Sequence, residues 1–251
     1  MNILASEWIK IRSVRSTWVL AASTVIVTVI VSLIGISGSL ADWVTELPAD
    51  WDPTGISFKG ILVGQILAAM LGVQAIASEY ASGMIITTLT ITPKRWALLA
   101  AKAGITALTA LLTSVVAVVV SFAAGQAMLG ASGLPTASVA DPDVRRALAC
   151  AVLYLVLSAV LGLAFGTITR SSSGALSIIV AIALLIPALA PGLPGVIGDV
   201  AGSYWPTTAG QAAYTVVDDG AVQPLVGIAV MTLFTLYSFI AAQAVLRFRD
   251  V

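Results

Sequence analysis

The sequence contains no histidine and one cysteine, and only 10% of its 251 residues are charged. Without histidine, the chain lacks the imidazole group that serves as a general base, a metal ligand and a switch near neutral pH. The single cysteine, Cys150, excludes a disulfide framework and a cysteine-based metal site. Because soluble domains carry about a quarter charged residues, this scarcity of charge argues against a soluble enzyme and for a membrane protein.

Hydrophobic residues make up 59% of the chain and gather in six stretches whose interiors hold no Asp, Glu, Lys or Arg. A transmembrane helix needs about 20 mainly apolar residues, so we predict an all-α membrane protein with one transmembrane domain over residues 1–251. The predicted spans cover residues 17–40, 61–78, 103–129, 147–169, 174–190 and 225–246. The first apolar run exceeds the core of about 7–15 residues found in cleaved signal peptides, and we expect it to be retained as an anchor.

The charged residues sort to opposite sides of these spans. One set of segments, which includes both termini, holds nine basic and three acidic residues, and the alternate set holds three basic and nine acidic residues. Lysine and arginine are retained on the cytoplasmic side of a membrane. We therefore predict a multi-pass protein of the inner (cytoplasmic) membrane with both termini in the cytoplasm. Arg145 and Arg146 count against an external position for the loop 130–146, but its place between two good spans assigns it to the outside.

No segment of the sequence offers a nucleotide site or a catalytic constellation. Residues 125–130 have the glycine spacing of a Walker A loop, but Ala131 stands where the lysine should be. Lys59 and Lys102 border predicted spans, and we expect both to snorkel to the membrane interface. We predict that the chain is not an enzyme, holds no cofactor or metal of its own and binds no nucleic acid.

The polar groups within the predicted spans are uncharged. Thr24, Thr28 and Ser32 recur every four residues and share one helix face, while Gln65 and Gln74 lie in the second span. These side chains either form hydrogen bonds between helices and to their own helix carbonyls, or line a mildly polar substrate path. Proton and sodium carriers usually place carboxylates within the bilayer, so energy for transport would come from outside this chain.

Two spans also carry small residues at four-residue spacing, a pattern that lets helix backbones approach closely within a subunit or across a dimer. These residues are Gly60, Gly64, Ala68 and Gly72 in the second span and Ser158, Gly162 and Gly166 in the fourth.

The cytoplasmic segment 79–102 contains a short predicted amphipathic helix. Its apolar face comprises Met84, Ile85, Thr88 and Leu89. Pro93 stops the helix, and Lys94 and Arg95 suit its C-terminal end. About ten residues cannot cross a bilayer, so this helix either lies on lipid or docks a soluble partner that supplies the missing energy.

Together these motifs resemble the permease subunits of type-2 ATP-binding-cassette (ABC-2) exporters. The cytoplasmic loop carries the resemblance at Glu79, Gly83, Leu89, Pro93 and Arg95. The opening segment 6–18 looks like the N-terminus of actinobacterial members of the family, where it forms an interfacial elbow helix. The segment 204–211 is similar to the external segment that these permeases carry before their last span.

The resemblance implies a half-transporter that pairs with a second copy or a paralogue and docks a separate ATPase subunit, where ATP and magnesium would bind. The implied coupling residues are Glu79, Gly83, Met84, Ile85, Leu89, Pro93, Lys94 and Arg95. The implied elbow residues are Leu4, Trp8, Ile11, Arg12 and Arg15. Met84 and Ile86 depart from the commonest family pattern, and re-entrant helices are implied between spans five and six.

The implied activity is outward movement of an amphipathic drug, a peptide or a lipid-like molecule across the membrane. Two alternatives stay open. One is a membrane protein that works without an ATPase, either as a secondary carrier or as a structural subunit. The other is an immunity protein that binds a toxic peptide without moving it.

Overall fold

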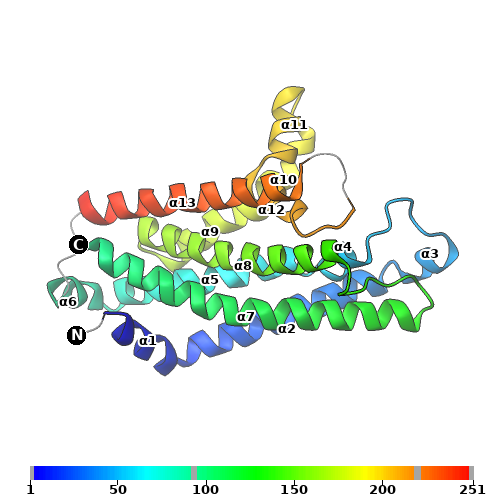
Figure 1. Cartoon of the computed structure of the whole chain (residues 1–251). Coiled ribbons are helices and arrows are strands. Elements are labelled where there is room, and N and C mark those ends of the chain that lie inside the picture. Colours follow the sequence, from blue (N-terminus) through cyan, green and yellow to red (C-terminus); the bar gives the residue numbers. More distant parts are fainter. Residues whose placement is uncertain (1–2, 92–94, 218–221, 249–251) are drawn as a thin grey trace.

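A computed structural model describes residues 3–91, 95–217 and 222–248, and within these ranges the chain is helical and contains no strand. Six helical segments are long and apolar enough to cross a membrane, which confirms the prediction of an all-α membrane protein. They are α2 (Arg15–Ser37), α5 (Ile61–Ala81), α7 (Arg95–Ala131), α8 (Pro142–Thr169), the segment Ser172–Gly192 and α13 (Pro224–Phe248). Figure 1 shows these helices running side by side along a common axis.

Two helices begin at least five residues earlier than hydropathy predicts. The third span was predicted from residue 103, but α7 starts at Arg95 and carries Lys102 within it. The fourth was predicted from residue 147, but α8 starts at Pro142, where the Asp141 side chain accepts a hydrogen bond from the amide of Asp143 at 2.9 Å. A capping aspartate followed by proline in the first turn is a strong helix start, so capping sets this boundary.

The fifth span is broken into short pieces, α9 (Ser172–Val180), a π turn (Ala181–Leu185), α10 (Ile186–Leu189) and a 3₁₀ turn (Ala190–Gly192). The carbonyl of Ile182 in the π turn accepts hydrogen bonds from the Trp205 indole at 2.8 Å and the Thr207 hydroxyl at 3.1 Å. Two further short helices, α11 (Val196–Ser203) and α12 (Pro206–Ala212), occupy the position of the predicted re-entrant segment. In Figure 1, α11 projects away from the bundle.

Glycine allows the central helices to touch backbone to backbone. A Cβ added at Gly72 of α5 would lie 1.8 Å from the Ala159 carbonyl of α8, and one added at Gly162 would lie 1.9 Å from the Ala69 carbonyl. A Cβ at Gly60 would likewise lie 1.9 Å from the Thr28 carbonyl of α2. The small-residue stripes on α5 and α8 therefore serve packing within this chain.

The bundle has two distinct ends (Figure 1). At one end lie α1 (Ile3–Ser13), α6 (Met84–Ile91) and the end of α13, and at the other lie α3 (Leu40–Thr45) and α4 (Pro53–Ser57). In the described part of the chain, the basic segments fall at the first end and the acidic loops at the second. The charge sorting found in the sequence is thus a separation in space.

Candidate functional site

The helix α6 is fixed to the bundle by one apolar side chain and exposes two others. Gly83 turns the chain out of α5 with a φ of 71°, in the left-handed region that glycine tolerates best. Ile85 is only 2% exposed and belongs to a hydrophobic cluster with Ile76 of α5 and Leu99 of α7. Met84 is 49% exposed. Ile85 therefore anchors the helix, and Met84 is available for an outside contact.

The other residues of the predicted coupling face are placed as follows. Thr88 is half-buried on α6, and Ile86, which was not assigned to this face, is 58% exposed. The Leu89 side chain lies outside the described part of the structure, as do Pro93 and Lys94.

Arg95 joins two of the long helices. It opens α7, and its guanidinium donates hydrogen bonds to the carbonyls of Leu246 at 2.5 Å and Arg247 at 3.4 Å. These carbonyls belong to the last turn of α13, where cations interact favourably with the helix dipole. Arg95 thus joins α7 to the last span.

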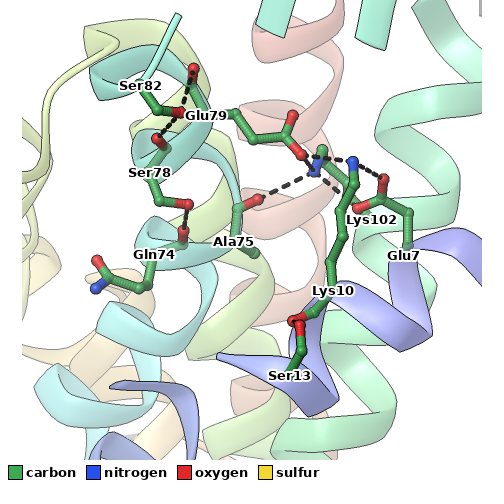
Figure 2. A network of polar contacts seen from close by, with 9 residues as sticks. All are labelled: Glu7, Lys10, Ser13, Gln74, Ala75, Ser78, Glu79, Ser82 and Lys102. Carbon is green, nitrogen blue, oxygen red and sulfur yellow. Dashed lines mark hydrogen bonds and ion pairs between the residues drawn. The ribbon is translucent and has the colours of Figure 1, made fainter. Parts of the chain in front are cut away.

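Four ionisable side chains meet at this end of the bundle, as Figure 2 shows. Glu7 and Lys10 come from α1, Glu79 from the last turn of α5 and Lys102 from α7. The Lys102 ammonium lies 2.8 Å from Glu7 Oε2 and 2.8 Å from Glu79 Oε1, and it donates a third hydrogen bond to the Ala75 carbonyl at 3.1 Å. The Lys10 ammonium lies 2.8 Å from Glu7 Oε1 and 2.8 Å from Glu79 Oε1. Two lysines and two glutamates make this ion cluster electrically neutral.

The position of Lys102 overturns the expectation that it snorkels to the membrane surface. Its side chain is 2% exposed, and the Glu7 and Glu79 side chains are 4% and 7% exposed. Burial of a charge is costly unless the charge is paired and hydrogen-bonded. Three acceptors satisfy the three N–H groups of this ammonium, which therefore has no need to reach lipid head groups.

The cluster shifts the protonation of its two α1 members in opposite directions. Burial favours neutral Glu7, but attraction from Lys102 and hydrogen bonds from both lysines outweigh this effect and lower the pKa of Glu7. Burial also favours neutral Lys10, but its hydrogen bonds to Glu7 and Glu79 prevail and raise the pKa of Lys10. Both groups are therefore held in their charged forms.

Helix α1 meets α2 at a sharp bend. Val14 between them is extended, with φ of −90° and ψ of 112°, and the Trp18 indole donates a hydrogen bond to the Arg12 carbonyl at 3.1 Å across the bend. Trp8 and Ile11 are half-buried, whereas the side chains of Arg12 and Arg15 are exposed. Arg15 begins α2, and the Leu4 side chain lies outside the described part.

A cavity of about 320 Å³ lies beside the ion cluster, between α1 and α5. Gln74 and Met84 line it together with Glu7, Lys10 and Glu79. Within the described ranges, no group of three His, Cys, Asp or Glu side chains is arranged to hold a metal ion.

The residues predicted to line a substrate path are mostly packed inside the chain. Thr24, Thr28 and Ser32 are fully buried. The hydroxyls of both threonines donate to carbonyls one turn earlier in α2, and Ser32 Oγ accepts a hydrogen bond from the Gly60 amide at 2.9 Å. These contacts match the interpretation as helix packing. Gln65 is 2% exposed, and its side-chain oxygen accepts a hydrogen bond from the hydroxyl of Tyr154 in α8.

Gln74 differs from the other four predicted path residues. It is half-buried and lines the cavity beside the ion cluster. Of the five residues predicted to line a substrate path, Gln74 therefore lines the cavity of about 320 Å³.

A comparison with protein families places this arrangement among known proteins. A sequence model described as ABC-2 family transporter protein matches residues 3–188, well over half of the chain. The match takes in α1, α6 and all four residues of the ion cluster, and it ends before α11. No curated protein matches the sequence significantly.

Proposed function

The chain belongs to the ABC-2 transporter family, and from this premise we propose that it is the permease subunit of an exporter driven by a separate ATP-binding-cassette ATPase. The observation that carries the proposal is the way α6 is anchored to the bundle while apolar side chains stay exposed. This helix stands at one end of the bundle, held by the buried Ile85, and leaves Met84 and Ile86 exposed. Such apolar side chains on a fixed helix suit the groove of a soluble partner.

The ion cluster supplies a route by which movement of α6 reaches the spans. Glu79 precedes α6 by one short turn, so displacement of α6 acts directly on the Glu79 carboxylate. That carboxylate is tied to Lys102 in α7 and, through Lys10, to α1. Withdrawing Glu79 with α5, or Lys102 with α7, would break both of its ion pairs and leave that charge buried without a partner, so α1, α5 and α7 move together as one unit.

In the same proposal, two such permeases, either copies or paralogues, form the substrate path between them. The charge separation orients the end with α1 and α6 toward the cytoplasm, where the ATPase has access to ATP and magnesium. Binding and hydrolysis of ATP would then rock the two subunits and move an amphipathic substrate outward.

Co-purification tests the partnership with the ATPase. An affinity-tagged chain extracted from its native membrane should bring down an ATP-binding-cassette ATPase, identified by mass spectrometry. Replacing Met84 and Ile86 together by Asp should abolish the association without disturbing the buried Ile85. Val44→Asp is the matched control, because Val44 is 59% exposed on α3 at the opposite end.

Two results would contradict the proposal. The first is recovery of the wild-type chain from its native membrane with no such ATPase. The second is a double variant that retains its ATPase as well as the Val44→Asp control does.

A further inference from the structure

A cavity lined by described residues lies at the end opposite to α6. It measures about 570 Å³ and is lined by residues at the start of α5, in α11 and α12, and at positions 214–217, 222 and 224. Its walls are largely apolar and include Phe58, Leu62 and Val222. A second cavity of about 290 Å³ adjoins it, since both are lined by Gly55 and Lys59. Ligand pockets typically have volumes of about 300–1,000 Å³.

Lys59 is held in a defined place at the junction of the two cavities. Its methylene stem packs against Gly35 of α2, where an added Cβ would lie 3.1 Å from Lys59 Cδ. Its ammonium lies 4.8 Å from the centre of the Trp43 ring, a distance at which the ring face attracts a cation. Lys59 is exposed, so the expectation that it reaches the membrane interface stays a prediction, and its contacts with Gly35 and Trp43 are what the structure adds.

The Lys59 ammonium is not neutralised by an ion pair. No carboxylate of the described residues lies within 4.0 Å of it. Asp52 lines the smaller cavity, but its carboxylate accepts hydrogen bonds from the amides of Thr54, Gly55, Val216 and Val217. Asp50 lines the same cavity. Among the described residues that line the larger cavity, Lys59 is the one charged side chain.

The larger cavity also contains an unused hydroxyl. Thr208 lines it, and Thr208 Oγ1 is buried without a hydrogen-bond partner among the described residues. A buried hydroxyl left without a partner costs about 1–3 kcal/mol, so a ligand that accepts a hydrogen bond there would gain by pairing with it. The apolar walls, the free ammonium and the free hydroxyl together describe an amphipathic ligand.

We propose that the larger cavity, with Lys59 at its junction with the smaller one, is a binding site for an amphiphile with an apolar body and an anionic head group. The body fills the larger cavity, and a carboxylate of the fatty-acid type accepts hydrogen bonds from Lys59. That this amphiphile is the transported substrate rests on the proposed function. The binding itself needs no ATPase, so its test stands apart from the test of the permease assignment.

Photo-crosslinking of the full chain in nanodiscs tests the site. The probe is a sixteen-carbon fatty acid that carries a diazirine, compared with an alcohol and an amine of the same chain. The carboxylate probe should label residues 55–62 and 202–217 in preference to the other two, and excess palmitate should suppress the labelling. Lys59→Met should weaken the apparent affinity about tenfold, because a charge-assisted hydrogen bond contributes about 1.5–3 kcal/mol.

A pair of glycine variants separates filling of the cavity from a general effect on the fold. A Cβ at Gly202, which lines the larger cavity, and one at Gly104, which lines neither cavity, would each meet no atom within 4 Å. Gly202→Phe should therefore abolish labelling by occupying the cavity, and Gly104→Phe should leave it unchanged. Equal labelling by the three probes, stronger labelling by the amine, or full labelling of Gly202→Phe would each overturn the proposal.

Discussion

Lys102 is the residue on which the ion cluster depends most, since its ammonium contacts both glutamates and the Ala75 carbonyl. Lys102→Met should destabilise the protein by about 3–5 kcal/mol, because it leaves two buried carboxylates with one ammonium between them. Thermal unfolding in detergent measures this loss. Arg12→Met, which removes an exposed cation from α1, is the control.

Adding Glu79→Gln to the Lys102→Met variant should recover part of the lost stability, since one positive and one negative charge are then removed together. The neutral pair of Glu7 and Lys10 remains in that double variant. The ion cluster would be unimportant for stability if Lys102→Met lowered the unfolding temperature no more than Arg12→Met.

The protonation of Glu7 makes the stability of the protein depend on pH. The folded protein lowers the pKa of Glu7 below its ordinary value of 4.5. The stabilisation is therefore complete above that ordinary value and is lost as the pH falls toward and through the pKa of the folded state. Unfolding temperatures of wild type and Glu7→Gln should differ most near neutral pH and converge on acidification. A difference that stays constant with pH would contradict the pairing.

The members of the ion cluster could not be found from the sequence by periodicity. Glu79 was singled out by its place in a family-like loop, but Glu7 and Lys102 lie 72 residues before and 23 residues after it in the chain. Lys102 borders an apolar run, where a lysine ordinarily reaches the membrane surface. Only the three-dimensional meeting of α1, α5 and α7 brings its acidic partners close enough to reverse that expectation.

At the scale of helices, the contact between α5 and α8 depends on glycine. Gly162→Ala should destabilise the protein by about 1–3 kcal/mol, because the added methyl group would lie 1.9 Å from the Ala69 carbonyl and force the helices apart. Gly104→Ala should instead be neutral or stabilising by up to about 1 kcal/mol, since its methyl group meets nothing within 4 Å and alanine favours a helix. Opposite shifts in unfolding temperature are thus expected, and a matching shift in both variants would contradict the close approach.

The sequence predicted the existence of all six candidate spans, because uncharged apolar runs of about 20 residues are typical of transmembrane helices. It placed the start of α7 eight residues too late, at residue 103 instead of 95, because hydropathy marks where a helix becomes apolar and not where it begins. It also predicted correctly that Thr24, Thr28 and Ser32 share a face. What that face contacts could not be predicted, because the glycines against which it packs belong to another helix.

At the scale of the whole molecule, the two ends have different tasks in this account. The basic end carries α1, α6 and the ion cluster, which suits contact with a cytoplasmic ATPase. The acidic end carries the two adjoining cavities at Lys59, which suits an amphiphilic ligand. The long helices of the bundle connect these two ends.

The central claim is that α6 is the contact site for an ATPase, and thiol crosslinking tests it most directly. In a Cys150→Ala background, cysteine is introduced at Met84 or at Val44, which are 49% and 59% exposed at opposite ends. Inverted membrane vesicles are then treated with a bismaleimide. We predict that Met84→Cys becomes linked to an ATP-binding-cassette ATPase and that Val44→Cys does not. A link from Val44→Cys, or none from Met84→Cys in vesicles that contain the ATPase, would contradict the account.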